Sequence, residues 1–132
     1  MATKPVGNGL RARVNSNEDL LVSTRPPNTL NAAPHNETEA QADHALVAAP
    51  GAGKRLVITR LQFSNGATPG TILFEAATAG AKTQYGPKWY MAANDKGNPE
   101  VYYVLGENLN FGFTSAAMTT HSVSCEYHIE PL

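Results

Sequence analysis

The chain has 132 residues, of which 42% are hydrophobic and only 16% are charged, and its formal net charge is −1. This length suits one domain, which would bury about two-thirds of the surface that the unfolded chain exposes. Ten basic residues against eleven acidic ones exclude the basic field that a general nucleic-acid-binding protein needs. The single cysteine, Cys125, excludes an internal disulfide framework and any multi-cysteine metal site. We also expect no membrane span and no signal peptide, because no apolar run reaches about 18 residues and the N-terminus lacks an apolar core.

Residues 1–42 differ in composition from the rest of the chain. They contain no Phe, Trp or Tyr, and prolines at 26, 27 and 34 interrupt any helix or sheet ladder. Their one apolar cluster, Leu20, Leu21 and Val22, is too small to build a core. We therefore predict an extended N-terminal arm over residues 1–42, which is either disordered or ordered on a partner through this cluster.

From residue 43 onward, short β-rich segments alternate with turn clusters of Gly, Pro, Asn and Asp. The clearest is the last one, where Val123, Cys125, Tyr127 and Ile129 alternate strictly with polar residues, as in a half-buried antiparallel strand. The segment 82–91 is either one bent strand or two short strands interrupted at Gly86–Pro87. The predicted strands are 43–48, 55–64, 71–77, 82–91, 101–105, 109–114 and 122–129.

Seven or eight short strands at a spacing near ten residues, without helical periodicity, indicate an all-β sandwich or barrel over residues 43–132. The alternation also predicts which side chains face the core. In the segment 55–64, we expect four side chains on one face: Val57, Thr59, Leu61 and Phe63.

The residue patterns name no catalytic or metal site. The segment 48–55 differs from a phosphate-binding loop at Ala48 and Arg55, and a strand follows it where a helix is needed, so we interpret it as a hairpin-type turn. His121 and His128 lie seven residues apart on one strand and so face opposite sides. The carboxylates are isolated in sequence, and an inward Cys125 would be inert. We expect a non-enzymatic protein with no cofactor and no metal.

Two adjacent aromatic pairs stand out. Neighbouring residues on a strand face opposite sides, so Trp89/Tyr90 and Tyr102/Tyr103 each place at least one large ring outside the core. Exposed Trp and Tyr are enriched in protein interfaces. These four residues are therefore candidates for a subunit interface. The alternatives are a platform for carbohydrate and edge aromatics that lie under a loop.

The order of several segments resembles a known family. An Asn-rich arm at 14–22 (VNSNEDLLV) precedes 54–61 (KRLVITRL) and 71–77 (TILFEAA), and a turn at 106–109 (GENL) leads to 123–127 (VSCEY). This pattern is similar to small tailed-bacteriophage virion proteins with a jelly-roll domain, of the capsid decoration or cement type.

The resemblance implies an antiparallel jelly-roll-like sandwich of about eight strands that forms a homotrimer and stabilises a capsid. It also implies an arm that grips the major capsid protein, a location on the virion surface, and assembly in the bacterial cytoplasm. Within the arm, the expected contacts are Arg11, Arg13, Leu20, Leu21 and Val22.

Two other functions stay open at this point. A receptor- or carbohydrate-binding module of a phage fibre or tail would use the exposed aromatics directly. A small sandwich hydrolase would need a nucleophile–base pair or two facing carboxylates, and no such signature can be named in the sequence. The partner expected on the leading hypothesis is a protein shell, not a nucleic acid or a membrane.

Overall fold

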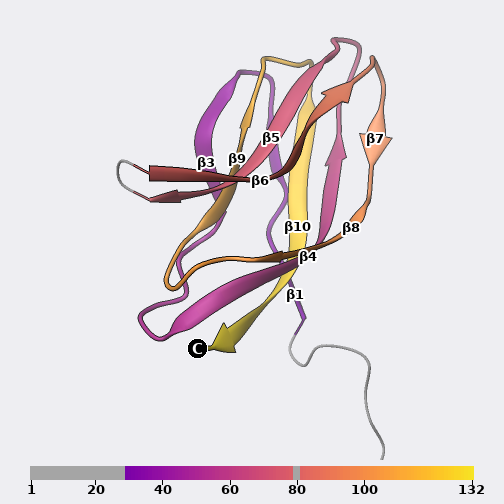
Figure 1. Ribbon diagram of the computed structural model, residues 1–132. Coiled ribbons are helices and arrows are strands. Elements are labelled where there is room, and N and C mark those ends of the chain that lie inside the picture. The colour runs from indigo at the N-terminus through magenta and orange to yellow at the C-terminus, as the bar shows by residue number, and fades with distance from the viewer. Residues whose placement is uncertain (1–28, 79–80) are drawn as a thin grey trace, which may run out of the picture.

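The computed structural model of the chain describes residues 29–78 and 81–132. These residues form ten strands and no helix, so the all-β class predicted from the sequence is confirmed. No helix long and apolar enough to cross a membrane occurs within the described ranges. Figure 1 shows the strands arranged as two antiparallel sheets that face each other, the architecture of a β-sandwich.

One sheet, sheet A, is built on two long central strands, β4 and β10, which pair antiparallel along almost their whole length. β1 and β2 pair with β10 at one edge, and β7 and β8 pair with β4 at the other. The bounds of these strands are β1 Leu30–Asn31, β2 His35–Glu37, β4 Lys54–Ser64, β7 Lys96–Gly97, β8 Glu100–Val104 and β10 His121–Pro131.

The other sheet, sheet B, has the strand order β3-β9-β5-β6. Its strands are β3 (Gln41–Val47), β9 (Phe111–Ser115), β5 (Gly70–Thr78) and β6 (Ala81–Met91). β6 is a single strand with a register shift opposite Ile72 and Phe74, so the bent-strand alternative for 82–91 holds. Within sheet B, only β5 and β6 are joined as a hairpin. Every other connection that begins or ends at a strand of sheet B leads to or from sheet A. The turn at residues 50–53 therefore links two sheets, and the hairpin predicted there is wrong.

The sandwich begins earlier than the sequence suggested. Within the range predicted as an arm, β1 pairs with β10 at Leu30↔Tyr127, and β2 pairs with it at His35↔Val123. Between these strands, Ala32 is buried in the core, and its N–H donates to the carbonyl of Cys125 at 2.9 Å. The predicted boundary between residues 42 and 43 thus lies too far along the chain. The predicted arm contacts Arg11, Arg13, Leu20, Leu21 and Val22 lie outside the described residues.

Aromatic rings fill the space between the sheets. Phe74 on β5 stacks with Phe111 on β9, with ring centroids 5.8 Å apart, and Phe63 on β4 reaches Phe74 from the other sheet at 5.9 Å. Each such ring removes a large apolar area from water, and this burial is the main source of stability. Of the predicted inward face of β10, Val123 and Cys125 lie in this core and Tyr127 packs against it, whereas Ile129 is 44% exposed.

The predicted face of β4 is half right. Leu61 and Phe63 lie in the core, but Leu56 and Ile58 are the inward residues of the first half, in place of Val57 and Thr59. The cause is a register shift, because Glu126 pairs with Arg60 whereas its neighbour Tyr127 pairs with Ile58. Thr59 is the extra residue of this bulge, and one extra residue inverts the alternation of a strand.

The pairing of β1 and β2 with β10 predicts different outcomes for two truncations. Deleting residues 1–28 removes none of these contacts, so we expect a change in the free energy of unfolding within about 0.5 kcal/mol. Deleting residues 1–42 exposes the edge of β10 and removes several ladder hydrogen bonds, each worth about 1 kcal/mol, so we expect a loss of about 3 kcal/mol or more. Urea denaturation followed by circular dichroism measures both. Equal stability of the two truncated chains would show that β1 and β2 contribute nothing.

Candidate functional site: exposed tyrosines and an aromatic pocket

β6 and β8 each turn one aromatic residue inward and the next one outward. Trp89 and Tyr103 are partly buried and pack against the core, whereas Tyr90 is 79% exposed and Tyr102 is 70% exposed. The prediction that each pair places a ring outside the core is therefore confirmed. That these residues form a subunit interface stays a prediction.

The inward rings close one side of the sandwich. Tyr103 on β8 meets Tyr85 on β6 with centroids 5.6 Å apart, and these strands belong to opposite sheets. Burial raises the pKa of both phenols, which keeps them neutral in this apolar seam. Gly86, with a φ of +70°, allows the contact, because a Cβ there would collide with the Tyr103 hydroxyl.

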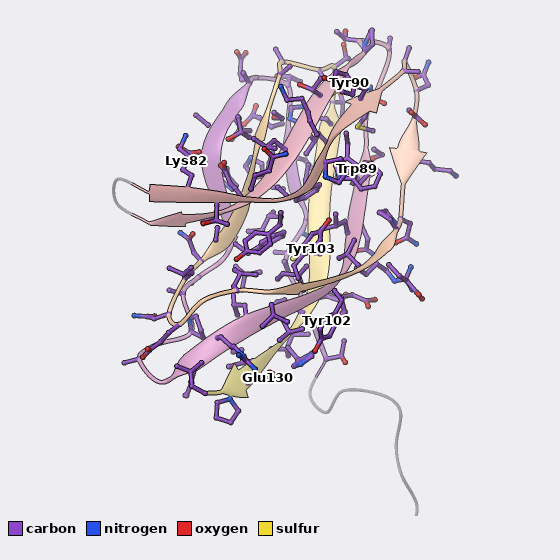
Figure 2. All side chains as sticks on the ribbon, viewed as in Figure 1. Lys82, Trp89, Tyr90, Tyr102, Tyr103 and Glu130 are labelled. Atoms are coloured by element: carbon purple, nitrogen blue, oxygen red, sulfur yellow. The ribbon has the colours of Figure 1, made fainter. Side chains whose placement is uncertain are left out.

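The two outward tyrosines do not form one patch. Tyr90 lies near the end of β6 in sheet B, and Tyr102 lies on β8 in sheet A, well separated from it in Figure 2. Tyr102 shares its surface with the partly exposed Val104. The molecule therefore offers two separate aromatic surfaces.

A pocket of about 420 Å³ lies between the end of β6 and the strand β7. Phe63 and Met91 are buried, and the partly buried Trp89 lies between them and the surface, with its ring centroid 5.3 Å from that of Phe63. The indole N–H of Trp89 is buried and finds no hydrogen-bond acceptor among residues 29–78 and 81–132. Figure 2 shows Trp89 on the side of β6 that faces sheet A. The lining residues are Phe63, Trp89, Tyr90, Met91, Asp95, Lys96, Gly97, Asn98 and Pro99.

Four polar side chains that the sequence did not connect meet across sheet B. Asp43 on β3 shares a hydrogen bond with Glu75 on β5, and Lys82 Nζ on β6 lies 2.9 Å from Asp43 Oδ1. The Thr114 hydroxyl on β9 donates to Glu75 Oε2 at 2.8 Å. Glu75 faces away from the core, yet this cluster leaves it only 2% exposed. The cluster thus joins all four strands of sheet B.

The two carboxyl groups of this cluster titrate in opposite directions. Hydrogen bonds from Glu75 and Lys82 lower the pKa of Asp43, whereas burial and the hydrogen bond to Asp43 raise the pKa of Glu75. Of the two carboxyl groups, Glu75 therefore holds its proton more tightly than Asp43 does. Glycoside hydrolysis needs two carboxyl groups separated by about 5 Å or more, so this bonded pair is a structural tie and not an acid–nucleophile pair.

A serine–histidine pair is also present and was missed. The Ser115 hydroxyl and His121 Nε2 lie 2.9 Å apart, and His121 Nδ1 lies 3.1 Å from the carbonyl of Met118. A carbonyl oxygen only accepts hydrogen bonds, so the proton lies on His121 Nδ1. His121 Nε2 then accepts from the Ser115 hydroxyl. This geometry resembles a nucleophile with its base. His121 is completely buried and Ser115 is 5% exposed, so no substrate reaches them and the pair satisfies polar groups inside the sandwich.

The other histidines and the cysteine also lie in structural settings. His121 points inward and His128 outward, where it contacts Glu130 at 3.0 Å, so their predicted opposition is confirmed. His35 and His44 stack with ring centroids 3.7 Å apart. In the described part of the chain, no three His, Cys, Asp or Glu side chains are grouped to hold a metal. Burial raises the pKa of Cys125 to about 12, so its thiol is unreactive near neutral pH.

The glycine-rich segment 50–53 has its amide groups occupied. Gly51 N–H donates to Asn108 Oδ1 at 2.8 Å, and Gly53 N–H donates to Glu107 Oε2 at 2.7 Å. A carboxylate of the chain thus stands where a phosphate-binding loop would hold its phosphate. The prediction that this segment is not such a loop agrees with this geometry.

Searches among protein families, curated proteins and solved structures find no match for this chain. The candidate functional surfaces of this chain therefore rest on its own structure alone.

The opposite orientations of adjacent aromatics predict a sharp split between alanine variants. Trp89→Ala and Tyr103→Ala remove packed rings and should each lower the free energy of unfolding by about 3 kcal/mol. Tyr90→Ala and Tyr102→Ala remove rings that already face water, and should change it by less than about 0.5 kcal/mol. Urea denaturation of the four variants measures this difference. Similar losses in all four would contradict the assigned orientations.

The raised pKa of Glu75 predicts an effect of pH on stability. The pKa of Glu75 is raised on folding, so the stability it contributes is complete below its unfolded pKa and is lost as the pH rises through its folded pKa. Glu75→Gln keeps a hydrogen-bond donor and has no proton to lose. The free energy of unfolding of this variant relative to that of the native chain should therefore rise as the pH increases above about 4.3, the usual pKa of glutamate. The exposed Glu39→Gln controls for the removal of one charge and should show no such trend.

Proposed function

We propose that the protein is a non-enzymatic structural protein of a tailed bacteriophage, which decorates the capsid as a trimer and stabilises it. Several features of the described residues support this proposal: the order of the strands, the two exposed tyrosine surfaces, and a set of polar clusters that tie strands together without facing a substrate.

The strand order supports the jelly-roll interpretation. β1 and β2 share one edge position of sheet A, and β7 and β8 share the other, which gives eight positions in chain order. Sheet A then has the order 1-8-3-6, and sheet B has the order 2-7-4-5. An eight-stranded double sheet made of two Greek keys is a jelly roll, a fold that viral capsid proteins use.

The observation that carries the proposal is the display of two tyrosines on rigid strands of different sheets. A large ring held in water on a strand is typical of a contact surface. A closed trimer needs two different surfaces that meet head to tail, because a cyclic interface between three copies is heterologous. Tyr90 with Trp89 on one sheet, and Tyr102 with Tyr103 on the other, supply two such candidates.

On this proposal, residues 1–28 make the contacts with the major capsid protein. The first strand of the sandwich, β1, begins at Leu30. A truncation of residues 1–28 therefore removes the proposed arm and keeps every strand. The proposed apolar contacts are Leu20, Leu21 and Val22, and the proposed charged contacts are Arg11 and Arg13. Assembly would take place in the bacterial cytoplasm, on the capsid surface, and without a cofactor.

Native mass and co-sedimentation test this function. The full chain should have a native mass of three times 14.1 kDa, and should sediment with capsid shells that lack their decoration protein. The chain without residues 1–28 should keep its fold and lose at least about tenfold in shell affinity, since several contacts worth more than about 1.4 kcal/mol together are removed. Multi-angle light scattering and quantitative pelleting measure these two quantities.

The matched pair Tyr90→Ala and Tyr102→Ala separates assembly from folding. At a concentration low enough for the native chain to be monomeric, both variants should unfold like it, whereas at higher concentrations they should shift the native mass towards the monomer. If the chain without residues 1–28 still occupies the shell fully, the arm does not make the contacts proposed for it. A full chain that is monomeric and does not sediment with shells would overturn the proposed function.

A further inference from the structure

The pocket between β6 and β7 combines an apolar floor with a polar rim. Phe63 and Met91 are buried and form the floor with Trp89, whereas Lys96 and Asn98 are exposed at the mouth. Its volume of about 420 Å³ lies near the lower end of the range for small-molecule sites, about 300–1,000 Å³. An apolar lining with a few convergent polar groups is the usual composition of a ligand site.

Polar groups at this pocket still have hydrogen-bonding capacity. Within residues 29–78 and 81–132, neither the Lys96 ammonium nor the Asn98 side-chain amide has a partner. Asp95 Oδ1 accepts from the N–H of Lys96 at 2.8 Å and Oδ2 accepts from the N–H of Ala92 at 3.3 Å, which fixes the carboxylate, and each oxygen can accept one further hydrogen bond. The pocket thus presents donors and acceptors together.

The rim is held rigidly before any ligand arrives. Asp95 N–H donates to Asn65 Oδ1 at 2.8 Å, and Asn65 Nδ2 donates to the carbonyl of Ala92 at 2.9 Å. Gly97 lies directly over Phe63, and a Cβ at this position would collide with the Phe63 ring. A preformed site loses little conformational entropy on binding, which favours affinity for a small ligand.

We propose that this pocket binds one pyranose ring of a carbohydrate. A sugar ring has apolar C–H faces that pack on aromatic floors, and its hydroxyl groups both donate and accept hydrogen bonds. Lys96 donates, Asp95 accepts and Asn98 does both, which matches hydroxyl groups around one ring. A nucleotide fits less well, because Asp95 would repel its phosphates and only one lysine lines the pocket. This site is separate from the capsid contacts proposed above and does not depend on them.

Tryptophan fluorescence tests the site directly, because Trp89 is the single tryptophan of the chain. The full-length protein is titrated with hexoses, N-acetylhexosamines, 6-deoxyhexoses and hexuronic acids, and calorimetry with the same sugars provides a second readout. We expect a saturable change in emission with at least one of these pyranoses. No saturable change and no binding heat with any of them would overturn the proposal.

Exposed residues at the rim give variants that keep the fold. Asn98→Ala and Lys96→Ala should each weaken sugar binding by about tenfold, the effect of losing one good hydrogen bond. Lys88→Ala is the matched control for Lys96, since Lys88 is an exposed lysine on β6 that does not line the pocket. Unchanged affinity in both rim variants would place the sugar elsewhere and overturn the site. Tyr102→Ala, on the other sheet, should bind like the native chain, and loss of binding there would also contradict the assignment.

Discussion

The antiparallel pairing of β10 with β4 is the interaction on which the other strands depend. It runs from Ser122↔Ser64 to Pro131↔Lys54 and places the two longest strands of sheet A at its centre. β1 and β2 can pair only because β10 offers its other edge, and β7 and β8 pair on the free edge of β4. The inward residues of these two central strands then supply the surface against which the phenylalanines of sheet B pack. The burial of these side chains stabilises a chain that has no disulfide.

The exposed tyrosines follow from what the core requires. Trp89 must point inward to pack on Phe63, and Tyr103 must point inward to meet Tyr85 across the seam. Adjacent residues on a strand face opposite sides, so Tyr90 and Tyr102 are forced into water. A smaller or polar residue would suit those positions if folding alone were selected, because water does not stabilise an exposed ring. Under the proposed function, these two exposed rings are the side chains available for contact with another molecule.

The sequence predicted local structure well and long-range encounters poorly. The strict alternation of apolar and polar residues over 122–129 predicted which side of β10 faces the core, because no residue of that segment interrupts it. It failed at Thr59, where one extra residue inverts the phase without any local mark such as glycine or proline. β1 and β2 were missed because two- and three-residue polar strands carry no periodicity. The Asp43–Glu75 tie, the Ser115–His121 pair and the sugar pocket join residues from different strands, and turn spacing does not specify which strands become neighbours.

The two proposals meet at one residue. Tyr90 is an exposed ring available for contact between subunits, and it also lines the proposed sugar pocket. A trimer contact that covers Tyr90 would cover part of the pocket rim, so sugar binding and assembly through this surface would compete by mass action. In the head-to-tail trimer proposed above both tyrosine surfaces are buried, so the pocket should bind sugar more weakly in the trimer than in the monomer. Equal sugar affinity in the two forms would show that the trimer leaves the Tyr90 side of the pocket uncovered.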